Sequence, residues 1–124
     1  MGYTCFNDVT ARDLQKKDVQ WTRSKSFDTF APMGPYIADP MLDVSKLAIE
    51  TRVNGELRQD SNTADLIFNV PYLIEFISSI MTLERGDIIS TGTPAGVGEL
   101  SAGDEIEVEI ENVGLLKNTV VSEN

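Results

Sequence analysis

The stretch that decides the fold is LAIETRVNGELRQD, residues 47–60. Over residues 47–53, apolar or β-branched residues alternate with small or charged ones, which is the two-residue period of a strand with one buried face. Asn54-Gly55 comes next, and this pair is typical of a tight hairpin because both turn positions require a positive φ. We therefore expect residues 56–60 to return as a second, antiparallel strand.

A second alternating stretch, EIEVEIE, covers residues 105–111 and places Ile106, Val108 and Ile110 on one face and four glutamates on the other. Such a row of glutamates could resemble a set of metal ligands. The four lie along one strand and do not converge, so the pattern favours a solvated face. A final strand is expected over residues 115–121 after a turn at Gly114, and residues 122–124 are expected to fray.

The first third of the chain predicts shorter elements. Residues 3–6 are expected to form a buried strand, and a helix is expected to follow it to about Lys17. Residues 20–30 predict an ordered loop or a 3₁₀ segment. Residues 31–37 contain two prolines, which exclude a helix and favour a strand.

The clearest helix is predicted over residues 69–82, where Pro71 is tolerated in the first turn. Apolar residues recur there at helical spacing: Val70, Leu73, Ile74, Ile77, Ile80 and Met81. We expect this helix to pack on the sheet, the alternative being an amphipathic helix that binds a partner. Residues 88–90 are expected to add a buried strand. Together these elements predict one α+β domain over residues 1–124, with short, mostly antiparallel strands, one main helix and one or two short helices.

Composition narrows the possible partners. Twenty acidic and ten basic residues give a net charge of −10, which disfavours nucleic acid and anionic membrane surfaces. The sequence has no apolar run of ~20 residues, the length that a membrane span requires. Cys5 is the only cysteine, so an internal disulfide is excluded and a reducing, cytoplasmic location is expected. The chain has no histidine, which excludes Ser-His-Asp, Cys-His and His-based zinc sites within it.

One polar stretch, NDVTARDLQ at residues 7–15, is poorly suited to a core. Asn7 or Asp8 is expected to cap a short helix. At ~100° per residue, Asp8, Arg12 and Gln15 fall on one stripe of that helix. A carboxylate, a guanidinium and an amide together suit a metal with an anionic oxygen ligand. The alternative is an exposed polar face with an ion pair between successive turns.

Two further segments contain residues suited to an anionic ligand. TGTPAGVG at residues 91–98 matches neither common nucleotide-binding glycine motif. Its glycines, Gly92 among them, would let backbone N–H groups and the hydroxyl of Thr91 or Thr93 approach a carboxylate, the alternative being a purely structural turn. Lys25 stands in an aromatic-rich segment, where it could meet an oxyanion in a dry pocket. An ordinary surface lysine is the alternative there.

Four segments together resemble the fumarylacetoacetate hydrolase (FAH) superfamily, in the order and spacing of that family. They lie at residues 2–15, 20–35, 53–60 and 86–98 and include NDVTARDLQ, WTRSKSFDTFAPMGP, VNGELRQD and GDIISTGTPAGVG. The resemblance implies an FAH-like β-roll, usually in a homodimer, that binds Mg²⁺ or Mn²⁺. It implies action on small 2-oxo or 2-hydroxy-dienoic acids by C–C bond hydrolysis, decarboxylation or keto–enol isomerisation.

The resemblance also implies roles for single residues. Asp8 matches the metal-binding aspartate of the family. Arg12, Gln15 and Lys25 match residues that face the 2-oxo acid, and Thr93 matches the threonine whose loop closes over the substrate carboxylate. Lys25 and Arg12 would act in catalysis by adding positive charge where an enolate oxygen develops.

The chain departs from the family pattern in one respect. The other two metal ligands of the family, a Glu-x-Glu pair, and its lid His/Glu dyad lie upstream of the first matching segment. We therefore expect the C-terminal part of such an enzyme, weakly active or inactive by itself. An alternative of a different class is a non-catalytic folded module that assembles with an N-terminal half or with itself, because an unpaired sheet edge favours association.

Overall fold

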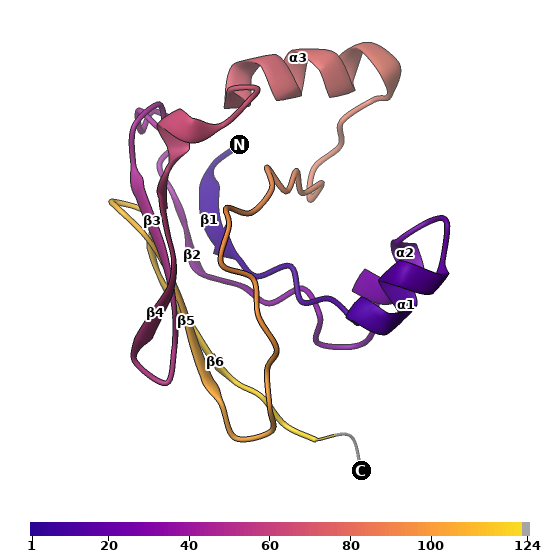
Figure 1. Cartoon of the computed structure of the whole chain (residues 1–124). Helices are drawn as coiled ribbons and strands as arrows, with labels where there is room; N and C mark the ends of the chain where they lie inside the picture. The colour runs from indigo at the N-terminus through magenta and orange to yellow at the C-terminus, as the bar shows by residue number, and fades with distance from the viewer. Residues whose placement is uncertain (123–124) are drawn as a thin grey trace.

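The computed structural model describes residues 1–122 as two antiparallel sheets and three α-helices (Figure 1). The first sheet pairs β1 (Tyr3–Phe6) with β2 (Met33–Ala38). The second has the order β4-β3-β5-β6 and contains β3 (Ala48–Val53), β4 (Glu56–Asn62), β5 (Glu105–Ile110) and β6 (Gly114–Thr119). The helices are α1 (Arg12–Lys17), α2 (Thr22–Lys25) and α3 (Val70–Ile80), with a 3₁₀ turn at Thr63–Asp65. This arrangement confirms the predicted α+β class with one main helix and two short ones.

The predicted hairpin is confirmed as β3 and β4. Its turn residues Asn54 and Gly55 have φ values of 53° and 79°, the left-handed conformation that the turn requires. The Asn54 side chain also connects the turn to the start of β5. Its amide donates to Asp104 Oδ1 at 2.8 Å, and its oxygen accepts from the Glu105 N–H at 2.9 Å. These bonds fix the hairpin against β5.

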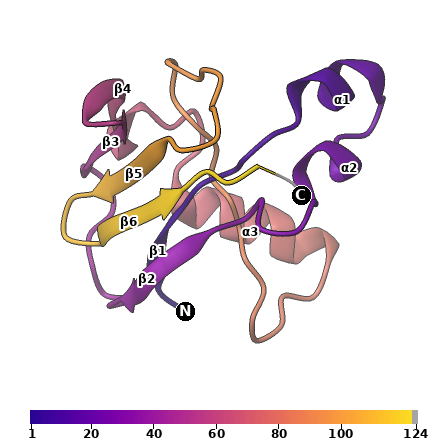
Figure 2. The same cartoon turned by 90° about the horizontal axis from the view of Figure 1, so that it is seen from below.

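The core lies between the inner face of the four-stranded sheet and β1. Val108 of β5 is paired with Leu116 of β6, and both side chains are buried together with Ile106. Cys5 of β1 is fully buried in the same cluster, and its thiol donates to the Gly114 carbonyl at 3.1 Å. Figure 2 shows β1 and β2 alongside β6, so the small sheet closes one side of this core. Cys5 is thus a small, fully buried residue of the core.

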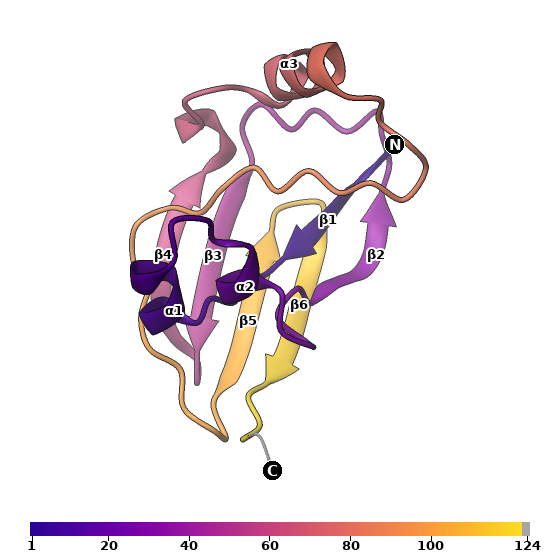
Figure 3. The same cartoon turned by 90° about the vertical axis from the view of Figure 1, so that its right-hand side faces the viewer.

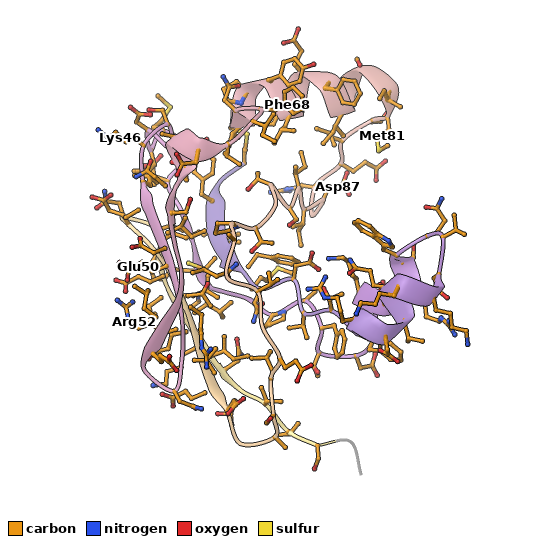
Figure 4. All side chains as sticks on the ribbon, viewed as in Figure 1. Lys46, Glu50, Arg52, Phe68, Met81 and Asp87 are labelled. Carbon is orange, nitrogen blue, oxygen red and sulfur yellow. The ribbon has the colours of Figure 1, made fainter. Side chains whose placement is uncertain are left out.

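The opposite face of the sheet has the predicted charged character. Glu50 and Arg52 point outward from β3, away from the rest of the molecule (Figure 4), and form an ion pair at 2.5 Å. Lys117 of β6 forms ion pairs with Glu105 at 2.5 Å and Glu107 at 3.1 Å on the neighbouring strand β5. Within residues 1–122, no three acidic, cysteine or histidine side chains converge as metal ligands. The glutamates of β5 therefore form a solvated, ion-paired face.

The predicted helix α3 is present, but its predicted packing on the sheet is wrong. Asn69 caps it by accepting a hydrogen bond from the Tyr72 N–H at 2.9 Å. The helix lies beyond the ends of the strands and not over a face of the sheet (Figures 1 and 3). Tyr72, Phe76 and Ile80 are 46%, 54% and 64% exposed. The sheet's inner face is already covered by β1 and by the chain that leads from α3 to β5.

The buried strand expected at residues 88–90 is also wrong. This segment has no regular secondary structure, and Ile88 is 53% exposed. Ile88 and Ile89 line a shallow apolar recess with Ile77 of α3 and with Met81, the residue after the helix. Fraying was expected at residues 122–124, and residues 123 and 124 lie outside the part that the structure describes. Across residues 1–122, no helix has the length and apolarity needed to cross a membrane.

Two adjacent leucines of β6 test the assignment of the core. Leu116 is 7% exposed and Leu115 is 45% exposed. Leu116→Ala should lower the free energy of unfolding by about 2–5 kcal/mol, because it leaves a cavity beside Val108. Leu115→Ala should cost about 1 kcal/mol or less, because it removes a half-solvated side chain. Urea unfolding followed by circular dichroism measures both values. Equal losses would contradict this placement of the core.

Candidate active site

The segment between β1 and α1 is extended, and the predicted helix start at Asn7 or Asp8 is wrong. Three backbone hydrogen bonds hold the segment against residues 24–32: Asn7 N–H to Pro32 O at 3.0 Å, Val9 N–H to Phe30 O at 3.2 Å and Ala11 N–H to Ser24 O at 2.9 Å. These N–H groups are therefore engaged across the chain and do not begin a helix. The helix α1 starts at Arg12, with Ala11 at its N-cap.

Asp8 and Lys25, far apart in the sequence, are brought together by this pairing. The Lys25 ammonium forms an ion pair with the Asp8 carboxylate. It also donates to the Thr10 hydroxyl at 3.3 Å. The side chains of Lys25 and Asp8 are 28% and 36% exposed, so the pair is open to solvent on one side. An ionised carboxylate and a cation are thus held at one accessible position.

Arg12 and Gln15 share one face of α1, as their spacing predicted. The Arg12 guanidinium donates from Nη1 to Gln15 Oε1 at 2.5 Å. Asp8 lies outside the helix, so the expected single stripe of Asp8, Arg12 and Gln15 is wrong in its geometry. The loop connections, and not helical spacing, bring Asp8 into this region.

A second ion pair, which the sequence did not predict, connects the end of α1 to α2. The Arg23 guanidinium donates to both carboxylate oxygens of Asp18, at 2.8 Å and 2.6 Å. This hydrogen bonding lowers the pKa of the Asp18 carboxyl and raises the pKa of Arg23. Ser24 is fully buried, and its hydroxyl donates to the Trp21 carbonyl at 2.7 Å. Lys25 follows directly in the chain, so these contacts fix the base of its side chain.

The glycine-rich loop at residues 91–98 is irregular, as expected, and lies against β4. Gly96 has a φ of 103°, and a Cβ at this position would stand 2.0 Å from the Arg58 carbonyl oxygen. Thr93 accepts a hydrogen bond from the Gln59 side chain at 2.8 Å. Figures 1 and 3 show that the chain between α3 and β5 crosses the side of the large sheet that faces α1 and α2. The loop and the Asp8–Lys25 pair therefore belong to the same side of the molecule.

A family model confirms the resemblance. The model of the fumarylacetoacetate (FAA) hydrolase C-terminal domain matches residues 1–121. The chain belongs to the FAH family. An uncharacterized protein of Archaeoglobus fulgidus is 68% identical over 98% of this chain and 48% of its own length. Oxaloacetate tautomerase YisK of Bacillus subtilis is 49% identical over 96% of this chain and 42% of its own length. The chain thus spans about half the length of these FAH-family relatives.

Solved structures support the FAH-family fold. The 5-carboxymethyl-2-hydroxymuconate delta-isomerase of Mycobacterium smegmatis has a TM-score of 0.95 and 48% identity, over 98% of this chain and 48% of that one. Maleylpyruvate hydrolase of Sphingobium sp. SYK-6, in complex with manganese and pyruvate, has a TM-score of 0.89 and 39% identity. That match covers 99% of this chain and 45% of the hydrolase. FAH-family membership confirms the fold class; the roles of individual residues stay predictions.

The described residues do not complete the divalent metal site expected of an FAH-family enzyme. A hard cation such as Mg²⁺ prefers several oxygen ligands. Asp8 offers one carboxylate, already paired with Lys25. Elsewhere in residues 1–122, no group of three potential ligand side chains is assembled. The described residues therefore do not assemble three side-chain ligands for such a site, and Asp8 is the one that the resemblance assigns.

The Asp18–Arg23 pair predicts a pH dependence of stability. The pKa of Asp18 is lowered on folding, so its stabilisation is present above the ordinary carboxyl pKa of ~4 and is lost as the pH falls through the folded value. Asp18→Asn should therefore make stability less sensitive to acid. Urea unfolding midpoints at neutral pH and at about pH 3 measure this difference. Asp28→Asn removes the same charge from the loop after α2, and it should leave the acid sensitivity unchanged. An Asp18→Asn variant as acid-sensitive as the parent would contradict the assignment.

Proposed function

We propose that this chain provides the substrate-facing part of an FAH-family enzyme that acts on a small 2-oxo acid or its enol form. The reaction would be keto–enol isomerisation, decarboxylation or hydrolysis of a C–C bond. The observation that carries the proposal is the pairing of Lys25 with Asp8 on the side of the sheet that the Thr93 loop crosses. The names of the relatives support the same class: an oxaloacetate tautomerase, and a maleylpyruvate hydrolase solved with manganese and pyruvate.

The proposed roles follow from the charge of a 2-oxo acid. Such a substrate carries a carboxylate, and its carbonyl oxygen gains negative charge when an adjacent bond breaks or a proton leaves. In a chain of net charge −10, a local cation is needed to bind it. Lys25 and Arg12 would stabilise the developing oxyanion, because a preorganised cation acts without rearranging in the transition state. Gln15, Gly92 and Thr93 would bind the substrate, the last through its hydroxyl.

Asp8 is proposed as one ligand of a divalent cation. Mg²⁺ or Mn²⁺ fits a carboxylate oxygen, and manganese in the maleylpyruvate hydrolase structure supports this class of metal. The ion pair with Lys25 orients the Asp8 carboxylate. Asp8 alone does not make a tight site, so its ligand role concerns a longer FAH-family protein.

Assembly with further polypeptide is a second proposed role, supported by α3. The exposed rings of Phe68, which precedes the helix, and of Tyr72 and Phe76 in the helix stack in succession, with ring centroids 5.0 Å and 6.4 Å apart. A continuous aromatic surface of this kind is typical of an interface. The cytoplasmic location stays a proposal. The homodimer implied by the family is also a proposal, and sedimentation equilibrium tests it. A monomer at all concentrations would argue against the homodimer.

The substrate class is tested with pyruvate as the probe, in the presence of Mg²⁺. Amide NMR spectra of the chain should shift at residues 8–15, at Lys25 and in the glycine-rich loop. Lys25→Met should weaken pyruvate binding by about tenfold or more, because a charged hydrogen-bond donor is lost. Lys46 lies near the α3 end of the sheet (Figure 4), and Lys46→Met is the control with the same loss of charge. Shifts confined to other surfaces, or equal effects of both variants, would contradict the proposal.

The incomplete metal site predicts weak metal binding by the 124-residue chain. Calorimetric titration with Mg²⁺ should give a dissociation constant in the millimolar range, because one carboxylate is the expected ligand. Asp8→Asn should weaken that binding further, whereas Asp13→Asn should leave it unchanged. Micromolar affinity in this chain would contradict the assignment of Asp8 as a single ligand.

A further inference from the structure

Gln59 of β4 makes two hydrogen bonds to the glycine-rich loop. Its side-chain nitrogen Nε2 donates to Thr93 Oγ1 at 2.8 Å and to the Pro94 carbonyl at 2.9 Å. The residue lies in the middle of the strand, opposite Thr51 of β3, and is half-buried. Its backbone is therefore fixed by the sheet, and its side chain reaches out from a rigid support.

The two bonds decide the direction of the Thr93 hydroxyl. A carbonyl oxygen only accepts hydrogen bonds, so the Pro94 carbonyl requires the nitrogen of the Gln59 amide, and not its oxygen, to face the loop. A primary amide nitrogen carries two hydrogens, and the two contacts use both. Thr93 Oγ1 consequently accepts from Gln59. Its own hydrogen is left to donate to another group.

The loop backbone keeps Thr93 within reach of Gln59. Gly96 packs so closely on the Arg58 carbonyl that any Cβ would overlap it. Gly92, on the other side of Thr93, has a φ of 104°, in the region that favours glycine. Thr93 thus lies between two glycines with positive φ, Gly92 and Gly96, and its side chain is exposed. A donor at this place is available to a ligand from solvent.

We propose that Gln59 is a positioning residue that orients the Thr93 hydroxyl to donate to the carboxylate of the substrate. Gln59 itself does not contact the substrate. This inference rests on the proposed function, since it takes the ligand of Thr93 to be the carboxylate of a 2-oxo acid. A hydroxyl that accepts from a fixed amide is preorganised as a donor, and it binds an anion without first turning away from another acceptor.

Glutamate and leucine at position 59 separate orientation from simple anchoring. Gln59→Glu provides a carboxylate that accepts from Thr93, so the hydroxyl hydrogen turns toward residue 59 and away from the ligand. Gln59→Leu removes both bonds and leaves the hydroxyl free to rotate. Pyruvate affinity, measured by NMR titration with Mg²⁺ present, should fall about ten- to a hundredfold in the glutamate variant. The leucine variant should lose less pyruvate affinity than the glutamate variant. A residue that only anchors the loop would show similar losses in both variants, because neither glutamate nor leucine can donate to the Pro94 carbonyl.

Three further variants complete the test. Thr93→Val should lose about as much affinity as Gln59→Glu, and the double variant should lose no more than the worse single one, because both remove the same donor. Thr93→Ser retains the hydroxyl and should bind like the parent. Gln20→Glu adds the same charge on an exposed segment before α2 and serves as the control. The dispersion of the amide spectrum verifies that each variant is folded.

The outcomes distinguish this inference from the proposed function. If pyruvate binds the parent chain but the position-59 variants bind it equally well, the role of Gln59 is overturned and the proposed substrate class stands. If Gln59→Leu binds pyruvate as weakly as Gln59→Glu, or more weakly, Gln59 is an anchor only, and the inference is overturned. If pyruvate causes no shift at the Thr93 loop of the parent chain, both the proposed substrate class and this inference are overturned.

Discussion

The register between β3 and β5 is the constraint on which the rest of the structure depends. It places Val53 beside Ile106 and Thr51 beside Val108, so both strands turn their apolar residues to the same face. A shift of one residue would turn the glutamates of β5 toward the core, where an unpaired charge is strongly unfavourable. Asn54 secures the register, because its side chain bonds both Asp104 and the backbone of Glu105. A single turn residue thus couples the hairpin to the strand that forms the centre of the core.

The neighbouring register, between β3 and β4, positions part of the candidate site. It determines where Gln59 and the Arg58 carbonyl meet the glycine-rich loop. On the other side of the core, Cys5 fastens β1 to the Gly114 carbonyl at the start of β6. The segment that follows β1 places Asp8 beside Lys25. Both halves of the candidate site are therefore attached to one rigid sheet, which is the support that precise substrate positioning requires.

Charge is divided between the two sides of the sheet. On the outer side, Arg52 and Lys117 are paired with glutamates of β3 and β5. On the inner side, Lys25 and Arg12 belong to α2 and α1, which face the chain between α3 and β5. In a chain of net charge −10, these two cations provide local positive charge on the side of the sheet that the Thr93 loop crosses.

The helices and strands that depend on neighbouring residues in the chain could be predicted from the sequence. The alternation in residues 47–53 and 105–111, the Asn54-Gly55 turn and the capped helix at residues 70–80 depend on neighbours in the chain, and each is present. The four FAH-like segments likewise indicate the family from the sequence, without any tertiary contact. Only the tertiary structure decided where α3 lies, that residues 88–90 form no strand and that Asp8 stands outside α1. These outcomes depend on which segments cover the sheet and on hydrogen bonds between distant residues, such as Ala11 to Ser24. The Gln59–Thr93 and Asp18–Arg23 contacts belong to the same group, because no local period relates their partners.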